Sequence, residues 1–276
     1  MPFARSGAAE IHYVSHGSAG DPAVLIHGAF EDGSTWDPVV PGLSPALAVV
    51  TYDRRGYGRS PNVARAHPVA DDAADLAAVL ETADHFPAHL IGLAYGAAVA
   101  VALARDRPEL VRSLVLHEPP FFELLGSDPA TAPDADRARE DLRRLRETAG
   151  PDAPAQVARQ VTDGVGAESG AWERMTTSER DRSARYVDRW REESDDPAAF
   201  GPDRAALRET LVPALITYGE ESPAIERRVA ESLATDLPYA RVQRLPECGH
   251  APHRTRPDLY VAVVGTFLLE RDVPPT

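Results

Sequence analysis

The stretch HLIGLAYGAAVAVALAR, residues 89–105, decides the fold. Its apolar run His89–Leu93 is typical of a buried strand, and the small residues of Ala97–Arg105 are typical of a helix packed closely against a sheet. Gly92 and Gly96 lie on either side of the junction, where glycine lets the two backbones approach each other. A strand that turns at once into a helix indicates a strand–helix–strand unit, and therefore a mostly parallel sheet.

The same alternation continues in both directions along the chain. Apolar runs of strand length are continuous rather than alternating, which favours strands covered on both faces. The runs that we expect to be strands are Ala23–His27, Ala48–Tyr52, His89–Leu93, Ser113–His117, Ala214–Tyr218 and Arg241–Leu245. Phe3–Arg5 and Glu10–Ser15 are separated by a Ser-Gly turn and predict a leading hairpin. Helical patterns cover Ala70–Thr82, Ala97–Arg105, the segment around Ile225, Val229 and Leu233, and the stretch that begins at Pro257.

The alternation stops between Pro119 and about Leu211, where helical patterns replace strands. These patterns are Asp134–Gly150, Ala153–Asp163 and Glu173–Glu193. A helical insertion between two strands of a parallel sheet is expected to form a lid over the carboxyl ends of the strands, where such sheets bind ligands. The chain is therefore divided into a first core part (1–118), a helical lid (119–211) and a second core part (212–276).

Composition excludes several classes of function. The chain has 276 residues and a net charge of −14, from 43 acidic and 29 basic residues, which argues against a nucleic-acid partner. The lone Cys248 rules out an internal disulfide and a multi-cysteine metal site, and no metal or cofactor is expected. The start of the chain does not resemble a signal peptide, and the longest apolar run, Ala97–Ala104, is too short to span a bilayer. We therefore expect a soluble, cytoplasmic protein with a small-molecule substrate and no membrane partner, and we leave its oligomeric state open.

Four motifs stand at the ends of predicted strands. The first is His27-Gly28-Ala29-Phe30, where a sharp turn directs a backbone N–H group into the site. The second is the loop Tyr52–Ser60, whose role is expected to be structural. The third, Gly92-Leu93-Ala94-Tyr95-Gly96, has the frame of the nucleophile elbow Gly-x-Ser-x-Gly, with alanine in place of the serine. The fourth, Cys248-Gly249-His250, follows the last predicted strand and offers a candidate general base.

In this order, the motifs resemble those of the α/β-hydrolase superfamily over nearly the whole chain. The sequence looks closest to the lid-bearing branch that contains small-molecule esterases, epoxide hydrolases and haloalkane dehalogenases. The resemblance implies a mostly parallel sheet flanked by helices, with a helical lid inserted before the last two strands. It also implies that Ala94 occupies the nucleophile position, that His250 is the general base, and that the N–H groups of Ala29 and Tyr95 form the oxyanion hole.

The acid that orients His250 departs from the common family pattern. The family's aspartate usually follows the strand that ends here at Tyr218, but this chain reads Gly219-Glu220-Glu221-Ser222. Some members carry the acid one strand earlier, where this chain has Glu118. We favour Glu118, with Glu221 as the alternative; Glu118 could also serve only to cap the strand.

An alanine at the elbow leaves three functions open. The first is general-base chemistry without a nucleophile on a small carbonyl compound, as in a lyase, epimerase, decarboxylase or cyclase. In the second, Ala94 is an engineered replacement for the nucleophilic serine of an ester or small-molecule hydrolase, whereas the first reading takes Ala94 as natural. The third is a ligand-binding relative without turnover. A largely apolar substrate is expected against Phe30, Phe121, Phe122, Trp172 and Trp190, although these rings could instead only pack the lid onto the core.

Overall fold

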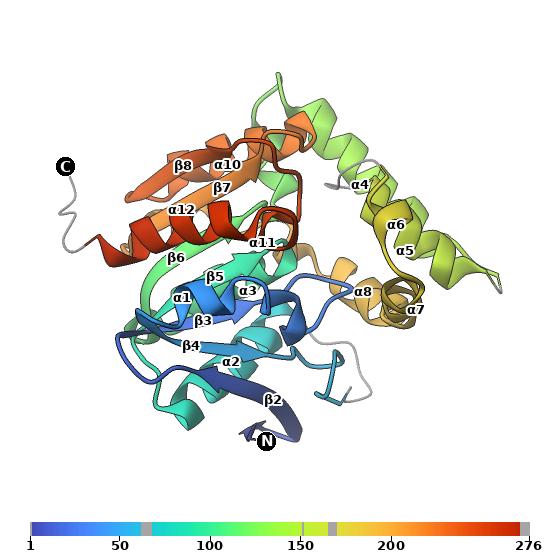
Figure 1. The fold of residues 1–276 in the computed structure, drawn as a ribbon. Helices are drawn as coiled ribbons and strands as arrows, with labels where there is room; N and C mark the ends of the chain where they lie inside the picture. Colours follow the sequence, from blue (N-terminus) through green and yellow to red (C-terminus); the bar gives the residue numbers. More distant parts are fainter. Residues whose placement is uncertain (1, 62–67, 151, 165–169, 271–276) are drawn as a thin grey trace.

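The computed structural model describes residues 2–61, 68–150, 152–164 and 170–270, and its centre is one eight-stranded sheet (Figure 1). The strand order is β1-β2-β4-β3-β5-β6-β7-β8. The first two strands pair antiparallel, β2 also runs antiparallel to β4, and the remaining neighbours are parallel. The strands are β1 Phe3–Ser6, β2 Ala9–His16, β3 Asp21–Ile26, β4 Leu47–Tyr52, β5 Ala88–Leu93, β6 Val111–His117, β7 Ala214–Gly219 and β8 Ala240–Leu245. The expected leading hairpin and the six expected core strands are confirmed, with ends shifted by one or two residues.

Helices cover both faces of the sheet (Figure 1). They are α1 Val40–Leu43, α2 Val69–Ala83, α3 Tyr95–Asp106, α4 Ala132–Glu147, α5 Ala153–Asp163, α6 Ala171–Arg174, α7 Thr177–Arg185, α8 Val187–Ser194, α9 Arg204–Glu209, α10 Ala224–Asp236, α11 Pro252–Thr255 and α12 Pro257–Leu269. Short 3₁₀ turns are η1 Gly33–Trp36, η2 Pro108–Leu110, η3 Phe122–Ser127 and η4 Pro197–Ala199. None of the helices in the described ranges is long and apolar enough to cross a membrane.

Two apolar cores lie on opposite faces of the sheet because successive strand residues point to opposite sides. In β5, Leu90 packs in the core that includes α2, α3 and α10, whereas Ile91 packs in the core that includes α1 and α12. Every residue of β4 and of β5 is buried. This double coverage explains why the central strands read as continuous apolar runs.

The inserted helices, which we define as η3 to α9, connect β6 to β7 and lie together at one end of the sheet (Figure 1). The helical pattern over Glu173–Glu193 is divided in the structure among the three helices α6, α7 and α8. Met175 is extended, and Thr176 then caps α7 in a capping box with Glu179. The Thr-x-x-Glu spacing was visible in the sequence and is the signal that marks this break.

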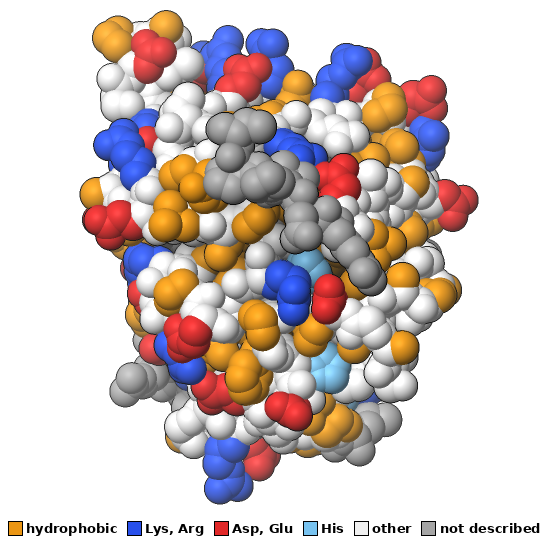
Figure 2. Space-filling model, turned by 90° about the vertical axis from the view of Figure 1, so that its left-hand side faces the viewer, with side chains coloured by type: hydrophobic (Ala, Val, Ile, Leu, Met, Phe, Trp, Pro, Cys, Tyr) orange, Lys and Arg blue, Asp and Glu red, His pale blue; other side chains and the backbone are white. Residues whose placement is uncertain are grey.

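Charged side chains are interspersed over the surface. Figure 2 shows arginines and acidic residues mixed over one face of the molecule. Many of them pair locally, such as Arg143 with Glu140 and Glu147 along α4. Mixed charges of this kind largely cancel each other's field at a distance.

Candidate active site

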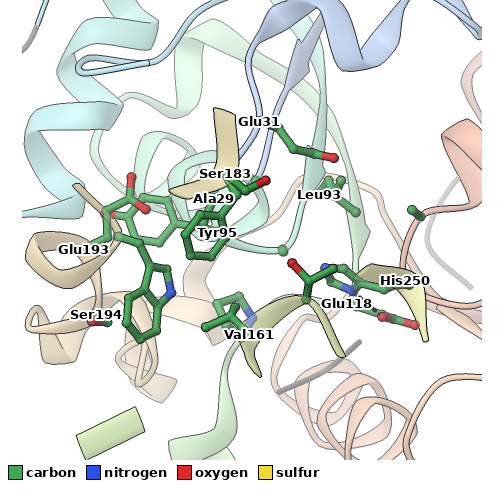
Figure 3. Close-up of a pocket in the computed structure, with 18 of the residues that line it drawn as sticks. Ala29, Glu31, Leu93, Tyr95, Glu118, Val161, Ser183, Glu193, Ser194 and His250 are labelled. Atoms are coloured by element: carbon green, nitrogen blue, oxygen red, sulfur yellow. Dashed lines mark hydrogen bonds and ion pairs between the residues drawn. The ribbon is translucent and has the colours of Figure 1, made fainter. Parts of the chain in front are cut away.

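A cavity of about 390 Å³ lies between the carboxyl ends of the strands and the inserted helices. One wall comes from the loops after β3, β5 and β6 and from the loop before α11, including Gly28, Leu93, Ala94, Glu118 and His250. The other wall comes from α4 to α8, with Leu142, Val161, Arg174, Ser183 and Trp190 among its residues. Figure 3 shows Glu118 and His250 together in one part of this cavity, and Glu193 and Ser194 in another. The strand-end motifs therefore converge on one cavity.

Ala94 holds the sharp turn between β5 and α3. Its φ of 48° and ψ of −118° lie in a region that residues with a β-carbon rarely adopt. A Cβ on Gly92 would lie 2.5 Å from the carbonyl oxygen of Gly96, and a Cβ on Gly96 would lie 2.3 Å from that of Ile26. Both glycines are therefore required by close backbone contact, and position 94 has elbow geometry with a methyl group as its side chain.

Glu118 is held at the end of β6 by the neighbouring strand. Its N–H donates to the carbonyl of Thr217 at 3.0 Å, and its Oε1 accepts from the N–H of Gly219 at 2.8 Å. Its Oε2 lies 2.6 Å from Nδ1 of His250. An ionised carboxylate only accepts hydrogen bonds, so Nδ1 carries the proton and Nε2 is the basic nitrogen of the neutral ring.

The pair shifts both protonation equilibria. Burial alone would raise the pKa of Glu118, but the neighbouring His117, the hydrogen bond with His250 and the N–H of Gly219 lower the pKa to about 2. Burial alone would lower the pKa of His250, but the hydrogen bond with Glu118 and its charge raise it above the ordinary value. The site thus contains an ionised acid paired with a strengthened base.

The other candidate partners and nucleophiles lie elsewhere. Glu221 is exposed, and its N–H donates to the carbonyl of Cys248 at 2.8 Å. The Oγ of Ser222 is buried without a hydrogen-bond partner among the described residues. Burial raises the pKa of the Cys248 thiol, and Cys248 does not line the cavity. Of the two candidate acids, Glu118 is therefore the one in hydrogen-bond contact with His250.

The two expected oxyanion donors both line the cavity. Tyr95 is the first residue of α3, so its N–H has no partner inside the helix. The carbonyl of Gly28 accepts from Arg54 at 3.0 Å and faces Nδ1 of His27 at 2.8 Å. A trans peptide points its N–H away from its own carbonyl, so the N–H of Ala29 points away from Arg54. Nothing in the described residues accepts a hydrogen bond from it.

The aromatic residues expected to bind substrate divide into two groups. Phe30, Phe122 and Trp190 line the cavity, and the rings of Phe30 and Trp190 stack with centroids 5.9 Å apart. Phe121 instead borders a second cavity of about 180 Å³ beside α3, since consecutive residues of the turn point in different directions. Trp172 also lies outside the main cavity, which Ala171 and Arg174 of α6 line instead, together with Met175 after the helix. The expectation that Phe121 and Trp172 line the pocket is therefore not met.

The sequence reasoning missed three carboxyl groups that line the cavity, those of Glu31, Glu193 and Glu226, and two of them have an unpartnered oxygen. Glu31 follows β3, and Glu226 lies in the first turn of α10. For each, the Oε2 atom is buried and has no hydrogen-bond partner among the described residues. Burial raises the pKa of both carboxyls, that of Glu226 well above its ordinary value. No motif marks either residue, because only the fold brings their loops to the same space.

A metal would have to compete with existing hydrogen bonds. His117, Glu118 and His250 place ligand atoms within 4.8 Å of one another. Both carboxylate oxygens of Glu118 already have partners, namely the N–H of Gly219 and Nδ1 of His250. The cluster is therefore better explained as an acid–base pair than as a metal centre.

Comparisons with known proteins identify the family and support the fold. The putative carbamate hydrolase RutD of Azorhizobium caulinodans is 36% identical over 42% of this chain, and the match spans only 43% of that protein. Pyrrolizixenacetamide deacetylase of Xenorhabdus hominickii is 29% identical over 99% of this chain and 100% of its own. The solved structure of the enol-lactonase from Burkholderia xenovorans LB400 shares the fold, with a TM-score of 0.73 at 22% identity over 98% of this chain and 100% of that one. A family model described as the alpha/beta hydrolase family matches residues 23–263. The chain therefore belongs to the alpha/beta hydrolase family.

Proposed function

We propose that the cavity hydrolyses a small, largely apolar ester, amide or lactone. The contact between Nδ1 of His250 and Glu118 at 2.6 Å carries this proposal, because it leaves Nε2 as a base in the cavity that Ala94 also lines. The N–H groups of Ala29 and Tyr95 serve as the donors for the oxyanion. The inserted helices act as the lid that excludes bulk water from these groups.

The methyl group of Ala94 cannot form an acyl-enzyme, so the attacking group is a water molecule. Nε2 of His250 takes a proton from this water as its oxygen attacks the carbonyl carbon. The charge that develops on the carbonyl oxygen is stabilised by the two backbone donors. Without a covalent nucleophile this reaction is slow, because in a serine protease the loss of the serine costs about a millionfold in turnover.

Hydrolysis is supported better than the other reactions that the sequence left open. Lyase, epimerase, decarboxylase or cyclase chemistry would use the same base and the same oxyanion donors. The full-length relative named above is a deacetylase, and the partial one is a putative carbamate hydrolase. Both names describe cleavage of an acyl compound, for which water is the second substrate.

The test is to supply the missing nucleophile. In Ala94→Ser, kcat/KM for p-nitrophenyl esters is expected to rise by about 10³-fold or more, because an activated hydroxyl replaces water. Adding His250→Ala to this variant should remove the gain, since the hydroxyl then has no base. If neither the unmodified chain nor Ala94→Ser hydrolyses any ester, amide or lactone that it binds, the protein is a ligand-binding member of the family and the proposal fails.

A further inference from the structure

Glu31 places a carboxyl group in the cavity that the mechanism above does not use. It follows Ala29 on the loop after β3, whereas His250 enters from the loop before α11 (Figure 3). Both Glu31 and Ala94 lie next to Gly28. A Cβ built on Gly28 would be 3.9 Å from Oε2 of Glu31 and 3.5 Å from the Cβ of Ala94. The free oxygen of Glu31 is therefore close to the elbow.

The contacts of Glu31 decide which of its oxygens carries a proton. Thr35 Oγ1 donates to Oε1 at 3.1 Å, and Nε2 of His253 lies 2.9 Å from the same hydroxyl. A hydroxyl has a single hydrogen, so when that hydrogen is given to Glu31, Nε2 of His253 must donate. Burial lowers the pKa of His253 well below its ordinary value, which is consistent with a neutral ring protonated on Nε2. Oε1 is then an acceptor, and the acidic proton of Glu31 belongs on Oε2.

Burial is what favours this protonated form. Oε2 of Glu31 is buried, and it has no hydrogen-bond partner in the described part of the chain. Burial raises the pKa of Glu31, although Arg254, His250, the hydroxyl of Thr35 and Arg182 oppose the shift. Glu31 lines the cavity, so a substrate group that reaches this buried O–H would be its hydrogen-bond acceptor.

We propose that Glu31 is the general acid of the Ala94 protein, donating the proton on Oε2 to the leaving atom of the substrate while His250 activates water. This assignment rests on the hydrolytic function proposed above. The serine mechanism does not need such an acid, because there the histidine returns the serine's proton to the leaving group. With water as the nucleophile, a base on one loop and an acid on another can act on the same carbonyl centre.

His250 and Glu31 account for every proton that moves during the reaction, and solvent then resets both residues. The water oxygen bonds to the carbonyl carbon, its proton goes to Nε2 of His250, and the carbonyl electron pair moves onto the oxygen. When that pair returns, the bond to the leaving oxygen or nitrogen breaks, and the leaving atom takes the proton of Glu31. The products are an acid and an alcohol or amine. His250 then loses its proton and Glu31 regains one through solvent.

The experiment compares esters of one acid that differ only in their leaving group. In Glu31→Gln, kcat/KM for alkyl esters should fall by about 100-fold, because an alkoxide leaves only with a proton. For p-nitrophenyl esters the fall should stay below about threefold, because nitrophenolate leaves without one. Glu31→Asp, which keeps the acid, should recover part of the alkyl-ester activity. The same Glu31→Gln change in the Ala94→Ser background should show no such dependence on the leaving group.

Glu226→Gln is the matched control, because Glu226 is also buried and lines the same cavity with an unpartnered Oε2. It should change all esters by one common factor. A uniform effect of Glu31→Gln, no effect, or turnover that appears only after Ala94→Ser would overturn the assignment of Glu31. Failure of the proposed function is a different result, in which neither the unmodified chain nor Ala94→Ser hydrolyses any ester.

Discussion

Ala94 shows how far a backbone can be fixed independently of its side chain. A conformation such as its own costs about 1–3 kcal/mol and persists only where the surroundings enforce it. Here the close contacts of Gly92 and Gly96 enforce it. This part of the site could be predicted from sequence, because the Gly-x-Ala-x-Gly spacing records the backbone requirement directly.

The choice between Glu118 and Glu221 could not be settled from sequence. Both follow a predicted strand, and spacing alone does not say which side chain reaches His250. The parallel register of β6 and β7 decides it, since it sets Glu118 beside Gly219 and leaves Glu221 in solvent. The role of Glu31 was still harder to predict from sequence. It depends on the burial of the carboxyl group and on an oxygen without a hydrogen-bond partner, and no local sequence pattern encodes either property.

The first residue-scale prediction concerns the titration of His250. Glu118→Gln removes the carboxylate that raises the pKa of His250 and leaves the burial that lowers it. The pKa of His250 should therefore fall below its ordinary value of 6.5. An NMR titration of the imidazole measures this shift. Glu221→Gln is the control and should leave the titration unchanged; the opposite pattern would assign the acid to Glu221.

At the scale of elements, a buried ion pair joins the loop after β4 to α8. Arg54 donates to Glu193 at 2.6 Å, Tyr57 donates to the same carboxylate at 2.9 Å, and Arg54 and Glu193 are at most 1% exposed. Arg54 also donates to the carbonyl oxygens of His27 and Gly28. One guanidinium therefore connects an inserted helix to the loop that carries the expected oxyanion donor.

Arg54→Met is expected to lower the free energy of unfolding by about 3–5 kcal/mol, because it removes a buried positive charge that faces both Glu193 and Asp72 and leaves Arg189 beside the two carboxylates. Replacing Glu193 by Met as well should recover much of this loss. Chemical denaturation measures both changes. The exposed pair Arg143–Glu147 on α4, at 2.6 Å, is the control, and Arg143→Met should cost less than about 1 kcal/mol. Equal losses at the two sites would show that the buried pair does not hold α8 in place.

The elements differed in how well their sequences predicted them. The core strands were found because apolar runs covered on both faces leave a continuous signal. The helical character of Glu173–Glu193 was predicted, but its breaks at Thr176 and Tyr186 were not. The Arg54–Glu193 pair was not found at all, since its partners lie 139 residues apart.

For the whole molecule, buried carboxyls with opposite pKa shifts shape the dependence of stability on pH. The pKa of Glu118 is lowered to about 2, so this group stabilises the fold above its ordinary value of 4.5 and loses that contribution as the pH falls toward 2. The pKa of Glu226 is raised well above 4.5 by burial, so this group destabilises the fold as the pH rises past 4.5. The two residues therefore act in opposite directions at neutral pH.

Glutamine at each position removes the titration and retains the size of the side chain. At neutral pH, Glu226→Gln should raise the free energy of unfolding and Glu118→Gln should lower it. Well below the ordinary glutamate pKa of about 4.5 the benefit of Glu226→Gln should disappear, and the deficit of Glu118→Gln should shrink. Denaturation curves at several pH values test this. A benefit of Glu226→Gln that does not depend on pH would contradict the account.

The elbow also has a genetic consequence. Alanine and serine codons of the GCN and TCN sets differ in their first base alone, and the turn around Ala94 is set by Gly92 and Gly96 rather than by the methyl group. A single nucleotide substitution can therefore restore a hydroxyl here without rebuilding the backbone. Growth selection on an ester as the sole carbon source, applied to a randomly mutated gene, would recover this change among the first survivors.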